Sequence, residues 1–411
     1  MIDFQSFTLE NGLQVIVHED KTIATAAVDI LYDVGSKDES PEKTGFAHLF
    51  EHLMFGGSKH IPNYDKPLQK VGGSNNAFTS PDITNYYITL PAENLETAFW
   101  LESDRMLSLS FDPQVLETQR KVVIEEFKQR YLNQPYGDLW LKLRPLAYSV
   151  HPYRWPTIGK DITHIEQASM EDVKTFFHKF YTPSNAIMVV AGNVAYDQVR
   201  KLAEKWFGSI PKYEKPVRSL PQEPQQTAPR FLEVTADVPL NAIYKTYHMC
   251  GKTSPHFHSS DLVSDILGRG KSSRLYASLL QDQKLFNSIN SYITGSMDDG
   301  LLVISGKLNQ GVSLQEADQA IQAEIDKLKS DGVSEEELSK VKNQAEATLV
   351  FSEVEILNRA MNLAYSTLLG DTNLINLEAG KIQAVSTQQI QARINETLVE
   401  NNCSTLYYTS M

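Results

Sequence analysis

The chain has 411 residues, of which 41% are hydrophobic, so the sequence predicts a folded protein whose length favours two domains over one. Its formal net charge of −13 argues against nucleic acid as the main partner, whereas an acidic cavity could attract basic peptides. Only two cysteines occur, Cys250 and Cys403, which excludes a disulfide framework and a cysteine-based zinc site.

The amino-terminal segment MIDFQSFTLENGLQVIVHED has neither the basic start nor the apolar core of a signal peptide. No run of about 18 apolar residues occurs in the chain, so no membrane span is expected. We therefore expect a cytoplasmic protein without membrane association, or a periplasmic one if a leader has been removed.

The first half alternates strands with long helices. Its patterns predict strands at 13–20, 25–36 and 84–91 and helices at 44–55, 93–108, 113–132 and 169–180. Strands interleaved with helices indicate the α+β class, with a sheet that carries helices on one face.

A proline-rich segment divides the chain near its middle. Between residues 208 and 230 stand five prolines: Pro211, Pro216, Pro221, Pro224 and Pro229. Proline fixes φ and lacks an amide donor, so this segment is neither a helix interior nor a central strand. We predict a first half at 1–210, an extended linker at 211–230 and a second half at 231–411.

The two halves resemble each other in the same order, which indicates an internal duplication. A helix with a serine start, followed by a strand, ends each half: Ser169 matches Ser386 and Asn185 matches Asn402, both at an offset of 217. The same α/β layer is therefore expected twice.

The segment GFAHLFEHLMFGG, residues 45–57, places three polar side chains in an apolar helix. His48 and His52 are four residues apart, so they lie one turn apart on one face, where two imidazoles can reach one metal ion. Glu51 lies on the same side, where its carboxylate could take a proton from water at the metal. A lone buried histidine is usually a hydrogen-bonded core residue, but an unpaired buried glutamate is costly. A divalent cation removes that cost.

Two histidines leave a metal site incomplete, and the helix DPQVLETQRKVVIEEFKQRYL offers a third ligand. Asp112 and Pro113 are typical of its first turn. Helix periodicity places Glu126 on an inward face with four residues: Val115, Gln119, Val122 and Val123. Glu125 shares a solvated face with four polar residues: Thr118, Lys121, Lys128 and Gln129. Glu126 is therefore the expected ligand.

The pattern H-x-x-E-H resembles the signature of the inverted zinc peptidases, the family of pitrilysin, insulin-degrading enzyme and the mitochondrial processing peptidase. The resemblance extends to the glycine pair Gly56 and Gly57, to the distance of Glu126 from His52, and to the segment NAFTSPDITNYY at 76–87. With the duplicated halves and the linker it covers essentially the whole chain.

The resemblance implies a two-lobed clamshell with one zinc ion in the first lobe, facing an enclosed chamber, and an inactive second lobe. It implies a zinc metalloendopeptidase in which His48, His52 and Glu126 bind zinc and Glu51 is the general base. It also implies that four residues lead onto an edge strand that pairs with an extended peptide: Asn76, Ala77, Phe78 and Thr79.

The sequence departs from the family pattern at two places. Gln119 stands where the family often has a second glutamate, so it could only hydrogen-bond near the metal without adding charge. In the second half, Gln281 stands where an arginine is expected and Phe286 to Ser288 where a tyrosine is expected. These family residues hold the substrate carbonyl and stabilise the oxyanion.

Because some members of the family work as pairs, we expect this chain to be the zinc-bearing subunit of a dimer. The partner is a paralogue that supplies the arginine and tyrosine, or a second copy of the chain. Two other functions stay open, a non-catalytic scaffold and a subunit that holds peptides without cutting. The peptides cut, the physiological metal (zinc, manganese or cobalt) and the activity of the isolated chain do not follow from the sequence.

Overall fold

The computed structural model describes all residues, Met1–Met411, and the chain forms two compact units. The first unit comprises Met1–Gln129, Trp155–Leu220 and Val350–Leu377. The second comprises Arg130–Arg154, Pro221–Leu349 and Glu378–Met411. Each unit therefore contains a segment from the other half of the chain, whereas the expected boundaries gave two continuous halves.

Two helices account for this exchange of segments. Helix α5 (Leu139–Ala147) belongs to the second unit, where its Leu143 is buried with Tyr244 and Tyr408. Helix α12 (Ile356–Leu368) belongs to the first unit, where Ala360, Leu363 and Ala364 pack against the sheet. An apolar helix face must be buried somewhere, and local sequence does not specify which sheet covers it.

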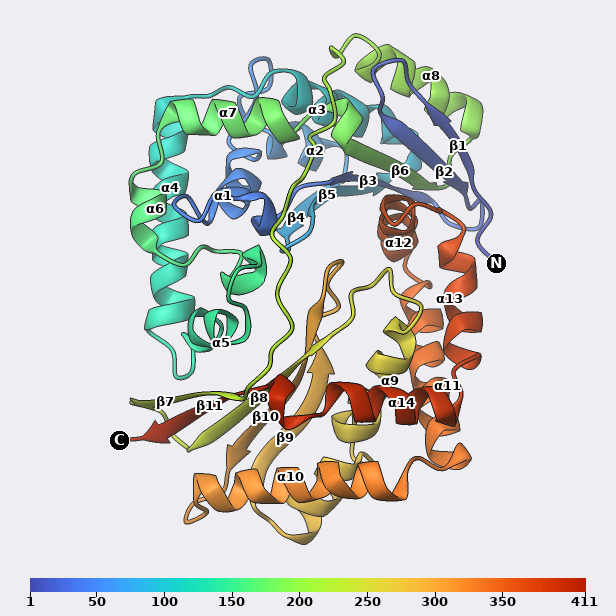
Figure 1. Cartoon of the computed structure of the whole chain (residues 1–411). Coiled ribbons are helices and arrows are strands. Elements are labelled where there is room, and N and C mark those ends of the chain that lie inside the picture. Colours follow the sequence, from blue (N-terminus) through green and yellow to red (C-terminus); the bar gives the residue numbers. More distant parts are fainter. The chain divides into compact units, whose positions relative to one another are not determined.

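The first unit is a six-stranded sheet with helices packed against it (Figure 1). Its strands are β1 (Gln5–Thr8), β2 (Gln14–Glu19), β3 (Thr25–Tyr32), β4 (Ser74–Thr79), β5 (Thr84–Pro91) and β6 (Ala186–Gly192). Its other helices are α1 (Phe46–Leu53), α2 (Asp65–Lys70), α3 (Leu95–Leu107), α4 (Pro113–Phe127), α6 (Ile162–Glu166), α7 (Met170–Phe180) and α8 (Tyr196–Phe207). The strands and helices predicted for the first half are all present, with ends shifted by a few residues.

The strand order of the first sheet is β1-β2-β6-β3-β5-β4, so β4 is an edge strand. Ala27 and Leu31 of β3 pack against α12. Tyr32, on the opposite face of β3, contacts the ring of Tyr181, which stacks on Phe50 of helix α1 at 5.1 Å. Helices therefore cover both faces of this sheet, and the expectation of helices on one face is wrong here because α12 arrives from the second half of the chain.

The second unit is a five-stranded sheet of order β7-β11-β8-β10-β9. Its strands are β7 (Arg230–Ala236), β8 (Ala242–Met249), β9 (Phe286–Ile293), β10 (Gly300–Leu308) and β11 (Cys403–Ser410). Its helices, besides α5, are α9 (Phe257–Gly268), α10 (Leu314–Asp331) and α14 (Thr387–Thr397). Helices α11 (Glu335–Ser352) and α13 (Leu374–Gln383) each have residues in both units, because the chain passes from one unit to the other within them. Ile266, Ile321 and Ile390, one from each of α9, α10 and α14, are buried in one core with the sheet.

The second sheet repeats five strands of the first in the same order. Strands β2-β6-β3-β5-β4 correspond to β7-β11-β8-β10-β9, and in each sheet the first two of these strands are parallel and the others antiparallel. The predicted α+β class, with the sheet-and-helix layer made twice, is confirmed.

The helix starts repeat as well. Ser169 and Asp172 form a capping box at α7, and Ser386 and Gln389 form one at α14. The side-chain amide of Asn185 donates to the carbonyl of residue 180, and the side-chain amide of Asn402 donates to the carbonyl of residue 397. Both hydrogen bonds are 2.9 Å long. The matched pairs found in the sequence thus have the same structural role in both units.

Residues 211–229 contain no helix or strand, as their prolines predict. Within the first unit, the guanidinium of Arg218 bonds to the carboxylates of Asp33 and Asp38 at 2.6 Å each. Within the second unit, the carboxylate of Glu223 accepts the amides of residues 149, 150 and 151 at 2.7–3.0 Å. One charged side chain near the middle of the linker therefore anchors it to the first unit, and another anchors it to the second.

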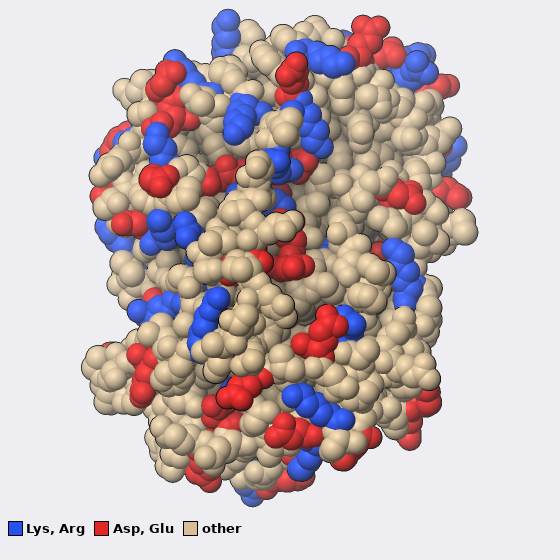
Figure 2. Space-filling view, in the orientation of Figure 1, with Lys and Arg blue, Asp and Glu red and all other residues tan.

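The surface, the cysteines and the hydropathy of the helices add three observations. On the face shown in Figure 2, acidic and basic side chains are interspersed and no basic patch gathers. Cys250 and Cys403 are free. None of the helices combines the length and the hydropathy that a bilayer span requires.

Candidate metal centre

Helix α1 is held in place by its apolar side. Five of its residues and the next one form this side and are at most 5% exposed: Phe46, Ala47, Leu49, Phe50, Leu53 and Met54. The ring of Phe50 stacks on Phe176 at 5.0 Å and on Tyr181 at 5.1 Å. Because these contacts fix the rotation of the helix, His48, Glu51 and His52 lie on its other side, where all three are half-buried.

The start of α1 depends on a glycine and a buried glutamate. Gly45 has φ +88°, and a Cβ there would lie 2.5 Å from the carbonyl oxygen of Ile158. The carboxylate of Glu39 accepts the amides of Gly45 and Ala47 at 2.9 and 2.8 Å. Burial raises the pKa of Glu39 to about 8, although both hydrogen bonds lower it. Sequence reasoning missed Glu39, since its contact depends on how residues 40–44 turn back.

Helix α4 supplies the third candidate ligand. Asp112 caps it by accepting the amide of Gln114 at 2.8 Å, as predicted. Glu126 is half-buried, whereas Glu125 is exposed and pairs with Lys128 at 2.8 Å, so the periodicity separated the two glutamates correctly.

The periodicity argument placed one residue of α4 on the wrong face of the helix. Val123 is 1% exposed, but Val122 is 44% exposed. The buried stripe of the helix follows Leu116, Val123 and Phe127, so its centre is rotated away from Val122.

The side chains of His48, His52 and Glu126 converge. One ligand atom of each lies within 4.8 Å of the others, and they are the one group of three such residues in the chain. Nε2 of His48 is 3.7 Å and Nε2 of His52 is 3.5 Å from Oε2 of Glu126. The two imidazole rings are nearly perpendicular, with centroids 4.9 Å apart.

These separations suit a small divalent cation. Ligand atoms about 2.0–2.1 Å from a tetrahedral zinc ion are roughly 3.4 Å apart, close to the two distances to the carboxylate of Glu126. Two neutral imidazoles and one carboxylate are also a donor set found at catalytic zinc sites, where a fourth position stays open. The residues therefore fit a zinc ion.

Glu51 lies beside this cluster in a partly desolvated position. Oγ1 of Thr79 donates to Oε2 of Glu51 at 2.7 Å. Burial is the largest cause that raises the pKa of Glu51, and the nearby carboxylate of Glu126 adds to it, whereas Thr79 and His52 oppose the shift. The pKa of Glu51 is thus moved toward the range of a general base that works near neutral pH.

The segment from Asn76 to Thr79 forms part of the edge strand β4 itself, where it had been expected to lead onto the edge strand. Asn76 and Phe78 are exposed, Ala77 is buried and Thr79 is half-buried. Side chains alternate along a strand, so Ala77 and Thr79 point to one face and Asn76 and Phe78 to the other. Helix α1 contacts β4, which brings the metal cluster to this edge.

Gln119 precedes Glu126 by two helical turns and is half-buried, so it lies on the same side of α4. In the second unit, Gln281 is exposed and Phe286 is buried in the core. Arg274, the nearest arginine in sequence, is bound to Glu337 at 2.7 Å. No arginine and tyrosine therefore stand at the two positions where the family pattern places them.

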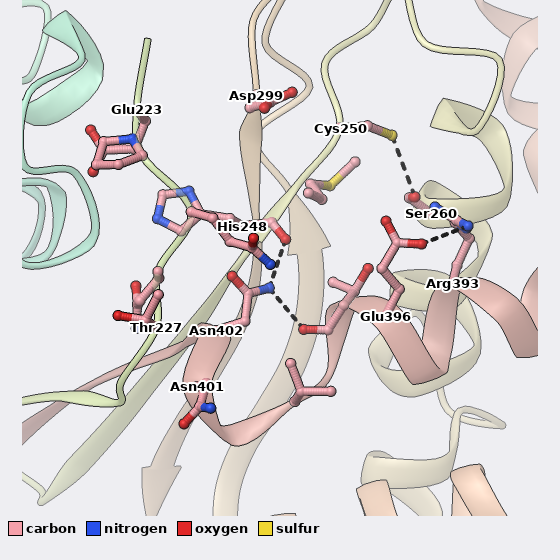
Figure 3. Close-up of a pocket in the computed structure, with 16 residues that line it drawn as sticks. Glu223, Thr227, His248, Cys250, Ser260, Asp299, Arg393, Glu396, Asn401 and Asn402 are labelled. Atoms are coloured by element: carbon pink, nitrogen blue, oxygen red, sulfur yellow. Dashed lines mark hydrogen bonds and ion pairs between the residues drawn. The ribbon is translucent and has the colours of Figure 1, made fainter.

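The second unit contains a polar pocket of about 590 Å³ between the linker, β8 and α14 (Figure 3). Its charged groups are already paired: Arg393 binds Glu396 at 2.7 Å, Glu223 accepts backbone amides, and Asp299 accepts the amide of Gly251 at 3.1 Å. No group of three metal-ligating side chains converges there. The candidate metal centre thus belongs to the first unit.

Comparison with known proteins places the chain in a family. Residues 14–141 match the family model described as insulinase, peptidase family M16, and residues 167–345 match the one described as the peptidase M16 inactive domain. The first match contains all three candidate ligands and Glu51.

Individual relatives cover most of the chain. Zinc protease PqqE of Helicobacter pylori is 33% identical over 356 residues, which are 84% of this chain and 79% of the relative. The beta subunit of the mitochondrial-processing peptidase of Saccharomyces cerevisiae is 26% identical over 363 residues, 84% of this chain and 77% of that one. A crystal structure of a protease from Helicobacter pylori superimposes with a TM-score of 0.93 at 29% identity and covers 100% of both chains.

The names of these relatives support a function of the metallopeptidase type, with zinc as the metal. The chain belongs to peptidase family M16, as a small member with two domains.

Proposed function

We propose that the chain is a zinc metalloendopeptidase that cuts short or unfolded peptides. The observation that carries this proposal is the convergence of His48, His52 and Glu126 with the carboxylate of Glu51 beside them. A scaffold has no need for a half-buried carboxylate next to a metal triad, because each such group costs desolvation energy.

In the proposed mechanism, His48, His52 and Glu126 hold zinc through two nitrogens and one oxygen. Zinc, when bound, supplies a Lewis acid that polarises the scissile carbonyl and makes water acidic enough to lose a proton near neutral pH. Glu51 would accept that proton on its carboxylate as the oxygen of the water forms a bond to the carbonyl carbon. It would then deliver the proton to the amine nitrogen as the C–N bond breaks. Gln119 would support the site by hydrogen bonding without adding charge.

The edge strand β4 is the proposed binding site for the peptide. An open sheet edge offers amides and carbonyls that any extended peptide can match, so affinity comes without strict reading of the peptide sequence. Asn76, Ala77 and Phe78 lie on this strand next to α1, and the exposed ring of Phe78 could contact a peptide side chain. Folded proteins present few free strands, which is why unfolded peptides are the proposed class.

We also propose that the chain works as the zinc-bearing subunit of a dimer. The second unit has Gln281 and Phe286 where an arginine and a tyrosine would contact the substrate, and Phe286 is 1% exposed. A second chain, either a paralogue or another copy, would supply the missing donors. One relative is itself named as a subunit, the beta subunit of the mitochondrial-processing peptidase.

The function is tested by measuring zinc content by mass spectrometry and hydrolysis of quenched fluorescent peptides. Glu51→Gln should keep zinc and lose at least about 100-fold in kcat, since the general base contributes that much or more. Glu126→Gln should lose zinc, whereas Glu125→Gln, its exposed neighbour, should keep both zinc and activity. Activity that survives in Glu51→Gln would exclude the mechanism.

The pairing proposal needs a separate measurement. The chain is assayed alone and together with any co-purifying paralogue, with the oligomeric state determined by light scattering. Full turnover by a monomer would exclude a dependence on a partner. One combination of results would favour a subunit that holds peptides without cutting. In that case the wild type hydrolyses no peptide, and Glu51→Gln changes neither peptide binding nor zinc content.

A further inference from the structure

Thr79 is the residue of β4 that contacts Glu51. Its hydroxyl donates to Oε2 of Glu51 at 2.7 Å. The side chain is half-buried and lies on the same face of the strand as the buried Ala77, opposite to the exposed Phe78. The sequence resemblance grouped Thr79 with the residues that bind the peptide, but its hydroxyl faces the base.

We propose that Thr79 is a positioning residue that orients the carboxylate of Glu51, and that it does not contact the peptide. The proposal rests on the proposed function, since it assigns Glu51 the role of the base. On this proposal, three residues of β4 bind the peptide, Asn76, Ala77 and Phe78, whereas Thr79 orients the base.

The geometry explains why Glu51 needs such a partner. A glutamate on a short helix has several rotamers, so its carboxylate needs a partner to hold one position. The bond from Thr79 fixes one oxygen, Oε2, so the other oxygen stays available to take and return a proton. Partners of this kind typically change activity by 10–100-fold when they are removed.

The position of Thr79 also links base orientation to peptide binding. Thr79 belongs to the strand that the peptide would extend, and it pairs across the sheet with Thr84 of β5. A peptide added to the free edge of β4 would restrain this strand and, through it, the hydroxyl that holds Glu51. An extended substrate would therefore align the base by the act of binding.

Three variants test the proposal in the full-length, zinc-loaded protein. Thr79→Val keeps the shape of the side chain and removes the hydroxyl, and Thr79→Ser keeps the hydroxyl. The matched control is Thr89→Val on β5, because Oγ1 of Thr89 bonds only to the exposed Ser74 at 2.8 Å on the same strand pair. Thermal unfolding and zinc content are recorded for each variant, and Thr79→Ala replaces Thr79→Val if the latter does not fold.

Kinetics with a quenched fluorescent peptide give the first readout. We expect Thr79→Val to lower kcat by about 10–100-fold with KM and zinc content unchanged, and Thr79→Ser to lose less than about threefold. Thr89→Val should behave as the wild type. A loss confined to KM, or equal losses in Thr79→Val and Thr79→Ser, would overturn the proposal.

Two readouts do not depend on turnover. In the Glu51→Gln background, Thr79→Val should leave the Kd of the same peptide unchanged, whereas a residue that contacts the peptide would weaken it. Crystal structures should show the carboxylate of Glu51 in one position in the wild type and in Thr79→Ser, and displaced in Thr79→Val. An undisplaced carboxylate would refute the positioning role. The absence of peptide hydrolysis by the wild type, both alone and together with a co-purifying partner chain, would refute the proposed function instead.

Discussion

Asp29 is a buried carboxyl in β3 whose ionisation opposes folding of the first unit. Its Oδ1 accepts the amide of Asn85 at 2.6 Å, whereas its Oδ2 and Oδ1 of Asn85 have no hydrogen-bond partner. Burial raises the pKa of Asp29 to about 7, the Asn85 bond lowers it, and the charge of Glu102 raises it further. A protonated Asp29 carries an O–H that could donate to Oδ1 of Asn85. An ionised Asp29 has no such donor, so its own Oδ2 and Oδ1 of Asn85 both stay without a hydrogen bond.

Because the pKa of Asp29 is higher in the folded chain than in the unfolded one, its contribution to stability is present below about pH 4 and is lost as pH rises through 7. A shift of about three pKa units corresponds to about 4 kcal/mol when the loss is complete. Asp29→Asn removes the titration and provides an amide that can donate to Asn85 at every pH. Relative to the wild type, we expect the variant to gain about 2–3 kcal/mol more stability at pH 8 than at pH 5.

The assay is urea unfolding at the two pH values, followed by tryptophan fluorescence, to which Trp155, buried in the first unit, contributes. The pKa of Glu39 is also raised, but Glu39 is present in both proteins, so its effect cancels in the difference. Asp197→Asn, at an exposed aspartate of the same unit, is the control for the change from a carboxylate to an amide. A stability difference for Asp29→Asn that is equal at both pH values would refute the reasoning.

Three further predictions concern the metal site, helix α1 and the linker. Zinc at 100 times its Kd should stabilise the folded first unit by about 2.7 kcal/mol, a gain that a chelator removes and that His52→Ala abolishes in thermal scans. Gly45→Ala should cost about 1–3 kcal/mol in denaturant unfolding and weaken zinc binding, because φ is +88° and a Cβ would meet Ile158 at 2.5 Å. Glu223→Ala should speed tryptic cleavage of the linker severalfold, since three amides lose their acceptor; a wild-type cleavage rate would contradict the anchoring role.

The features that sequence predicted well are those encoded within one or two turns of a helix or one strand. His48 and His52 are one turn apart, and the period of α4 separated Glu126 from Glu125. The helix starts were equally readable, since a serine cap and its partner lie three residues apart, as at Ser169. In each case the residues that interact are close in the chain, so their spacing carries the geometry.

The features that sequence could not predict depend on segments that are distant in the chain. Glu39 reaches the start of α1 only through the loop between them, and Thr79 meets Glu51 across 28 residues. Val122 was misplaced because the exposure of a helix face depends on which elements cover it. The same reason explains the exchange of α5 and α12, because local sequence does not specify which sheet covers an apolar helix face.

The comparison of α1 with its counterpart α9 shows which part of the duplication serves folding and which serves chemistry. At an offset of 213, Asp261 and Asp265 of α9 stand where His48 and His52 stand in α1. Asp265 is bound to Arg269 at 3.1 Å, and burial together with Asp265 raises the pKa of Asp261 to about 6. Asp265 is therefore engaged by Arg269, and no third metal-ligating side chain converges with these two carboxyls.

Both units keep the strand order and the capped helix because each sheet needs them to bury its core. The histidines of α1 add nothing to that core, since they lie on the side of the helix away from its apolar contacts, and so a copy of the fold can lose them without losing stability. The same argument applies to Gln281: an exposed position is free to change its chemistry while Phe286 beside it stays in the core. A second unit that keeps the fold but lacks the arginine and the tyrosine agrees with the proposal that a partner chain supplies these two residues.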